Sequence, residues 1–201
     1  SLFLKFCNIL SISSFTSNQL SKFNNIKLDK ITYFPCCIEL NSLNAEDKYQ
    51  KNNKNISLLS VSRLDKTETQ KGIDSVLKAL KIVSKQYSKI LYTVIGKGDD
   101  ISRLNKISKD LNLDNQVIFK GYVENIEPYY QNTDIFILPS KKEGFGIVYL
   151  EAMKYKKPVI ACNYGGTTDV VLNNKTGILC KYNNINEISL AILKLIHNNK
   201  I

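Results

Sequence analysis

Residues 56–80, ISLLSVSRLDKTETQKGIDSVLKAL, decide the fold of this sequence. The stretch opens with a short, mostly apolar run that lacks strict alternation, as in a strand covered on both faces. A polar loop follows, and then apolar residues recur at helical spacing with lysines on the opposite face. The apolar face consists of Ile73, Val76, Leu77, Leu80 and Val83. The stretch therefore predicts a strand, a loop and an amphipathic helix.

The same unit recurs along the chain. Further short apolar runs lie at 90–95, 117–119, 135–138, 158–162 and 177–179. Amphipathic stretches of helical length separate them, with apolar faces at Ile101, Leu104, Ile107 and Leu111, and at Ile185, Ile188, Ile192 and Ile196. Strands alternating with helices from about residue 55 to 198 predict an α/β fold, a Rossmann-like parallel sheet with helices on both faces.

A smaller unit precedes this domain. Residues 2–10, LFLKFCNIL, predict a buried strand, because they are far shorter than the roughly 18 continuous apolar residues that span a bilayer. Ser13 or Ser14 is expected to cap a helix at about 15–24, and a short strand follows near 31–35. Residues 41–55 are polar and without periodicity, which is typical of a linker. We expect three parts, 1–38, a linker at 39–55, and a main domain at 56–201.

Composition excludes several functions. The net charge is +10, but the lysines are scattered singly, and no stretch alternates basic residues with exposed aromatic residues. A solvated, lysine-rich surface is therefore favoured over a nucleic-acid-binding module, and no nucleic-acid partner is expected. Five cysteines without a CxxC spacing indicate reduced thiols rather than a zinc site or disulfide framework. The single histidine, His197, argues against histidine metal sites and Ser-His catalysis. The sole methionine, Met153, lies deep in the chain, so we expect a segment of a longer protein.

Chemistry is expected in the loops that follow the strands, because ligands of open parallel sheets bind beyond the carboxyl ends of the strands. The loop after 135–138 reads PSKKEGFG and enters a helix. Gly144 and Gly146 let backbone amides approach a ligand at the helix start, where anions and sugar oxygens are favoured. Glu143 and Glu151 can accept hydrogen bonds from hydroxyl groups at two points of an extended ligand.

This glutamate pair resembles the motif of glycosyltransferase family 4, whose members have the two-domain GT-B fold. The resemblance covers almost all of residues 56–198, through VIGKGDD, VIFKGYV, DIFILPS and CNYGGTTDVV. It implies that this chain is the C-terminal, donor-binding half of such an enzyme, with residues 1–38 a remnant of the N-terminal domain. By the same resemblance, the donor sugar would contact Glu143 and the amides of Gly144, Phe145 and Gly146, and the ribose hydroxyls would contact Glu151.

The family also shows an Arg-Leu followed by a Lys-Gly after the first strand of this domain. Arg63 and Lys71 stand at these places, which implies that they hold the diphosphate, as arginine and lysine suit phosphate oxygens. The intervening DKTETQ is longer than the commonest family version. In GGTTDVV, the family usually has proline and glutamate where Thr168 and Asp169 stand, so Asp169 is a further candidate for a donor contact.

The family resemblance implies transfer of a sugar from a nucleoside-diphosphate sugar to a glycan or lipid-linked acceptor, with retention of configuration. No metal and no cofactor is expected beyond the donor substrate, and the acceptor-binding N-terminal domain would be the partner. We expect a cytoplasmic protein, either free or peripheral at the cytoplasmic membrane face. A phosphorylase or nucleotide-sugar epimerase on the same fold is the nearest alternative, and a non-catalytic or nucleic-acid-binding module a distant one.

Overall fold

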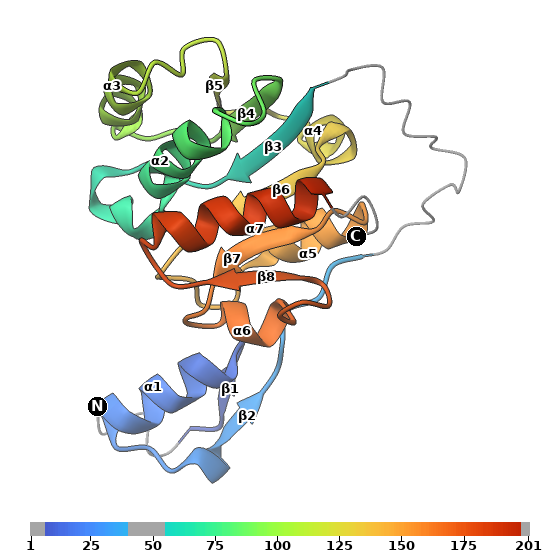
Figure 1. Ribbon diagram of the computed structural model, residues 1–201. Coiled ribbons are helices and arrows are strands. Elements are labelled where there is room, and N and C mark those ends of the chain that lie inside the picture. Colours follow the sequence, from blue (N-terminus) through green and yellow to red (C-terminus); the bar gives the residue numbers. More distant parts are fainter. Residues whose placement is uncertain (1–6, 40–54, 198–201) are drawn as a thin grey trace.

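The computed structural model describes residues 7–39 and 55–197. The first range forms a small unit that lies below the main domain in Figure 1. It contains β1 (Ile9–Ser11), α1 (Ser14–Asn24), a 3-10 turn (Leu28–Lys30) and β2 (Ile31–Tyr33), and its two strands pair in parallel. Ser13 caps α1, because its hydroxyl accepts a hydrogen bond from the Thr16 amide at 3.0 Å.

The main domain contains a six-stranded sheet in which every strand pairing is parallel. Its strands are β3 (Ile56–Val61), β4 (Ile90–Ile95), β5 (Val117–Gly121), β6 (Ile135–Leu138), β7 (Val159–Cys162) and β8 (Gly177–Cys180). They lie in the order β5-β4-β3-β6-β7-β8, the doubly wound order of a Rossmann-like domain. The order reverses between β3 and β6, and this reversal is where such sheets bind ligands.

Helices cover both faces of this sheet, as predicted. The helices α2 (Ile73–Val83), α3 (Ile101–Asp110) and α7 (Ile185–His197) pack side by side on one face, whereas α4 (Glu127–Asn132) and α5 (Ile147–Lys154) lie behind the sheet in Figure 1. A single turn, α6 (Thr167–Val170), follows β7. The predicted apolar face of α2 is fully covered, with Val76, Leu77 and Leu80 each at 0% exposure. No helix within 7–39 or 55–197 is long and apolar enough to cross a bilayer.

The six strands predicted for the main domain are confirmed to within two residues at either end. The predicted buried strand at 2–10 is wrong about burial, because Leu10 in β1 is 68% exposed; residues 1–6 of the chain lie outside the described ranges. The predicted linker at 39–55 lies outside the described residues except for its first and last positions. The three-part division of the chain therefore stays a prediction.

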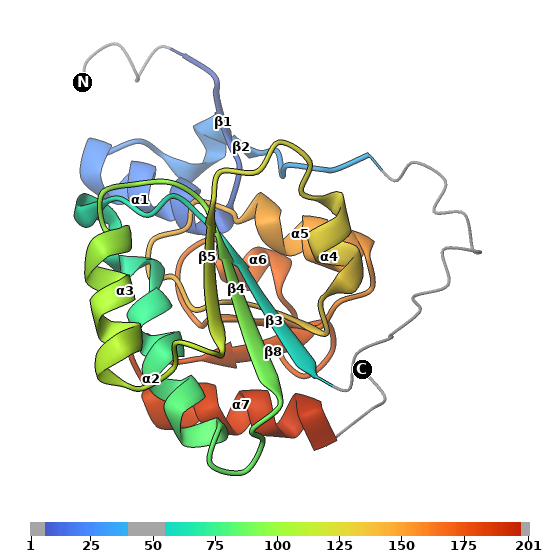
Figure 2. The same cartoon turned by 90° about the horizontal axis from the view of Figure 1, so that it is seen from above.

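The small unit lies at the carboxyl edge of the main sheet (Figure 2) and contacts the segment that follows β7. The Asp169 carboxylate accepts two hydrogen bonds from Ser14, one from the backbone amide at 2.6 Å and one from the hydroxyl at 2.5 Å. Phe15 adds an edge-to-face contact with Tyr164, with ring centroids 5.4 Å apart. Because Ser14 is the first residue of α1, the carboxylate also complements the positive end of that helix.

We expect Asp169→Ala to loosen α1 without unfolding the main domain. Loss of these exposed, charge-assisted bonds costs about 1 kcal/mol, which raises the hydrogen-exchange rate of amides in α1 about fivefold. Exchange measured by mass spectrometry checks this, with Asp114→Ala as a control that removes an equal charge from an exposed position. Unchanged protection of α1 in Asp169→Ala would show that the contact does not hold the small unit.

Two cysteines lie side by side at the carboxyl ends of β7 and β8. Cys162 and Cys180 are register partners, and each is 1% exposed. Burial is the main cause that raises the pKa of Cys162 to about 11 and that of Cys180 to about 12. The reactive thiolate of each is therefore scarce at any pH well below these values.

We accordingly expect iodoacetamide at pH 8 to modify the exposed Cys37 and to leave Cys162 and Cys180 unmodified in the native protein. At that pH roughly one in a thousand Cys162 side chains carries a thiolate, and burial blocks access to it as well. Peptide mass spectrometry before and after addition of denaturant provides the measurement. Native labelling of Cys162 at the rate of Cys37 would contradict the burial of β7.

Candidate functional site

The loops after β3 and β6 meet where the strand order reverses. The Lys71 ammonium donates to Glu143 Oε1 at 2.8 Å, although the two residues are 72 positions apart in the chain. Both side chains are largely buried, at 14% and 15% exposure. The Lys141 amide also donates to the Gln70 carbonyl at 2.9 Å. Two candidate residues predicted from separate motifs are therefore in direct contact.

Glycines allow this close packing of loops. Gly72, at the start of α2, has a φ of +77°, and a Cβ there would lie 2.6 Å from the Pro139 carbonyl oxygen. A Cβ on Gly166 would lie 1.9 Å from the Gly144 carbonyl oxygen, and the Gly166 amide donates to the Glu143 carbonyl at 2.9 Å. The paired glycines after β7 thus support the loop that carries Glu143.

That loop presents backbone donors at the start of α5. Gly146 is the N-cap residue, with a φ of +95°. Within the described part of the chain, the amides of Gly144, Phe145 and Gly146 donate no hydrogen bond. Free N–H groups in front of a helix N-terminus favour an anionic or oxygen-rich ligand. These amides lie next to Glu143 in the chain, and their role in binding a donor stays a prediction.

Glu151 lies on α5 and receives a hydrogen bond from a neighbouring helix. The Tyr130 hydroxyl, on α4, donates to Glu151 Oε2 at 2.7 Å. Tyr130 is 1% exposed and stacks on Tyr155 with parallel rings. Burial first, and then the Glu151 charge, raises the pKa of Tyr130, so its hydroxyl stays protonated and remains a donor. The carboxylate of Glu151 is thereby held in one orientation.

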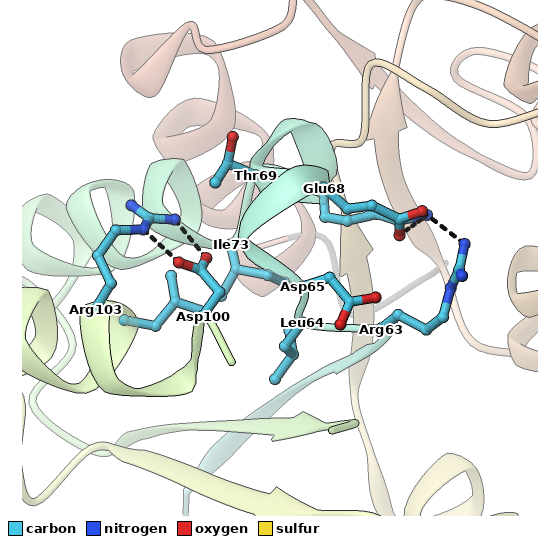
Figure 3. Close-up of a pocket in the computed structure, with 10 residues that line it drawn as sticks. Arg63, Leu64, Asp65, Glu68, Thr69, Ile73, Asp100 and Arg103 are labelled. Atoms are coloured by element: carbon cyan, nitrogen blue, oxygen red, sulfur yellow. Dashed lines mark hydrogen bonds and ion pairs between the residues drawn. The ribbon is translucent and has the colours of Figure 1, made fainter. Parts of the chain in front are cut away.

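Arg63 follows β3 and shares an acidic partner with Lys71. Its Nη2 lies 2.6 Å from Glu68 Oε1, and Lys71 Nζ lies 3.9 Å from Glu68 Oε2. The loop after β3 contains a 3-10 helix, Lys66–Lys71, from which the Glu68 side chain reaches Arg63 (Figure 3). Side chains of this loop and of the start of α3 line a narrow cleft.

The structure brings together most of the predicted site residues. Arg63, Lys71 and Glu143 form a connected set of charges, and the three amides of 144–146 adjoin it. Asp169 is engaged by Ser14, so its donor contact remains a prediction. Arg103, the second arginine, lines the same cleft as Arg63, but Asp100 binds its guanidinium through two hydrogen bonds of 2.6 Å.

Three residues that contact the predicted site residues were not predicted to do so. Glu68 could have been found as the acid that stands between the Arg-Leu and Lys-Gly pairs. Tyr130 and Ser14 carry no such signal, because their partners lie far away in the sequence. Within residues 7–39 and 55–197, no three His, Cys, Asp or Glu side chains gather as metal ligands would.

Comparison with known proteins agrees with this geometry. The family described as "Glycosyl transferases group 1" matches residues 42–201. The uncharacterized glycosyltransferase MJ1069 of Methanocaldococcus jannaschii is 34% identical, over 100% of this chain and 52% of its own length. The capsular polysaccharide biosynthesis glycosyltransferase CapM of Staphylococcus aureus is 28% identical, over 98% of this chain and 54% of its own.

A solved structure shows the same fold. The crystal structure of Anabaena Alr3699/HepE in complex with UDP and glucose superposes with a TM-score of 0.86 at 20% identity, covering 99% of this chain and 56% of that one. The chain thus spans about half the length of the relatives it matches. With a parallel sheet of this order and a family match over most of its length, the chain belongs to the group 1 glycosyl transferases and has the fold of one half of a GT-B enzyme.

Proposed function

We propose that this chain binds the donor of a retaining glycosyltransferase, which transfers a sugar from a nucleoside-diphosphate sugar to a glycan or lipid-linked acceptor. The observation that carries the proposal is the contact between Lys71 and Glu143 at the reversal of strand order, beside three backbone amides that have no partner among residues 7–39 and 55–197. A cation, a carboxylate and amides at one point match the three kinds of group in such a donor: phosphate, sugar hydroxyls and bridging oxygens.

Each group has a role in this proposal. Arg63 and Lys71 would bind the diphosphate, and Lys71 would turn from Glu143 toward a phosphate oxygen when the donor enters. Glu143 would then accept hydrogen bonds from sugar hydroxyls. Glu151, oriented by Tyr130, would accept them from the ribose. No divalent cation is part of the proposed site, since the cations and amides stabilise the negative charge that develops on the leaving diphosphate.

Retention of configuration follows from the face of attack. In the proposed reaction, the acceptor oxygen bonds to the anomeric carbon from the face that the diphosphate leaves. The bond from that carbon to the phosphate oxygen breaks, and the acceptor proton passes to the same phosphate. Protein groups then act by position and charge, without a covalent intermediate.

The small N-terminal unit supports the proposal of a separate acceptor domain. Six large apolar side chains of this unit are between 41% and 74% exposed: Leu10, Ile12, Phe23, Leu28, Tyr33 and Phe34. An exposed apolar surface of this extent on 33 residues is typical of an interface. We propose that an acceptor-binding domain of the same protein covers it and completes the two-stranded sheet.

The relatives guide the choice of donor and pathway. CapM is named for capsular polysaccharide biosynthesis, and HepE was solved with UDP and glucose. We therefore propose a uridine nucleotide as the first donor to test and a polysaccharide or glycolipid as the product. The free thiols of the chain fit the reducing cytoplasm, where we place the protein, either free or at the membrane face.

Calorimetry with uridine, guanosine and adenosine diphosphates tests the site. We expect the chain to bind at least one of them and Arg63→Ala to bind it about 10-fold to 100-fold more weakly, because a hydrogen bond to a charged group contributes about 1.5–3 kcal/mol. Lys120→Ala removes an equal charge from an exposed position on β5 and should bind as the unmodified chain does. Absence of binding, or equal affinity in Arg63→Ala, would refute the site.

Assays of the complete parent protein for transfer, phosphorolysis and epimerisation then separate the alternatives on this fold.

A further inference from the structure

Glu68 occupies the space between the two cations that are proposed to bind the diphosphate. One carboxylate oxygen lies 2.6 Å from Arg63 Nη2, and the other lies 3.9 Å from Lys71 Nζ. Figure 3 shows the Glu68 side chain pointing toward Arg63, with a dashed line for the ion pair between them. A carboxylate held by two cations offers negatively charged oxygens to the same donors that a phosphate would use.

The charges of the four side chains at the proposed diphosphate site cancel in the protein without a ligand. Arg63 and Lys71 are positive, and Glu68 and Glu143 are negative. A diphosphate that approaches this neutral set gains little attraction unless a carboxylate gives up its place. The backbone of Glu143 is fixed, because its carbonyl accepts a hydrogen bond from the Gly166 amide inside the packed loops. The Glu68 side chain is the more exposed of the two, at 22% against 15% for Glu143, and is therefore the carboxylate better placed to leave.

The surroundings of Glu68 also support its role as the carboxylate that leaves. It lies in the short 3-10 helix Lys66–Lys71, where its backbone departs from helical angles, with a φ of −118° and a ψ of 31°. Its Oε2 atom is buried yet accepts no hydrogen bond from the described residues. A fully bonded structural anchor would not leave that oxygen unsatisfied. The attraction of Arg63 and Lys71 therefore accounts for the position of the carboxylate.

We infer that Glu68 is an internal anion that competes with the diphosphate for Arg63 and Lys71. It rests on the proposed function, in which these cations bind the donor. In the free protein Glu68 holds the cations in place, and on binding it swings toward solvent and the diphosphate replaces it. After transfer, its return helps to displace the nucleoside diphosphate. Glu68 thus sets the affinity of the site for diphosphates and speeds product release.

The test compares Glu68→Gln with the unmodified chain by calorimetry, using uridine diphosphate and uridine as probes. The glutamine keeps the shape of the side chain and removes the competing charge. We expect uridine diphosphate to bind about threefold to tenfold more tightly and to dissociate more slowly by a similar factor, while the affinity for uridine stays unchanged. Weaker or unchanged binding of uridine diphosphate would overturn the inference.

A matched control separates competition from a general effect of charge. Asp65 lies three positions away, lines the same cleft and forms no ion pair within the described residues. Asp65→Asn should leave the affinity for uridine diphosphate unchanged, and an equal gain in this variant would overturn the inference. The gain from Glu68→Gln should also shrink in an Arg63→Ala background, since Glu68 and the diphosphate then no longer compete for Arg63.

Failure of the inference can be told apart from failure of the proposed function. If the unmodified chain binds uridine diphosphate and Arg63→Ala weakens that binding, the diphosphate site stands, whatever Glu68→Gln does. If the unmodified chain binds no nucleoside diphosphate, both proposals fall. Glu68→Ser is the second variant should Glu68→Gln not fold, with the same tighter binding expected.

Discussion

The ion pair between Lys71 and Glu143 joins the two halves of the main sheet at the point where the strand order reverses. The loop after β3, on one side of this point, carries Arg63 and Lys71, and the segment after β6, on the other side, carries Glu143, Glu151 and the amides of 144–146. A partly buried pair of this kind gains attraction from a low local dielectric but loses hydration on both charges. Its net contribution to stability is therefore small, and its main effect is to align the two loops.

That alignment depends on backbone packing around it. Gly72 and Gly166 bring neighbouring loops to distances that no side chain permits, and the carbonyl of Glu143 is fixed by an amide of the adjacent loop. The amides of 144–146 donate no hydrogen bond within the described residues. A rigid frame with unsatisfied donors at one point is what preorganised electrostatic stabilisation requires, because no reorganisation is needed when charge develops.

Much of the fold could be predicted because its signals are local. The run 56–61 and the apolar face of α2 reflect burial on both sides of a sheet, and Ser13 reflects the need of a helix start for an acceptor. Within the site, Lys71 and Glu143 were predicted from separate motifs by resemblance, although their contact was not. The bonds from Tyr130 to Glu151 and from Ser14 to Asp169 join residues far apart in the chain, and no local pattern encodes such pairs. The exposure of Leu10 was missed because a short apolar run does not show what covers it.

The longer loop between Arg63 and Lys71 shows how preorganisation and affinity oppose each other. Two cations left alone near each other repel, and their long side chains lose conformational entropy when a ligand orders them. An acid between them removes the repulsion and orders both side chains before the ligand arrives, but it also cancels the charge that would attract the ligand. In the proposed reaction a diphosphate is released after every transfer, and that cancellation would favour its release, since tight binding of product slows turnover. One carboxylate oxygen of Glu68 is bonded to Arg63, and the other is buried without a hydrogen bond among the described residues. This arrangement agrees with a site that exchanges one anion for another rather than holding one tightly.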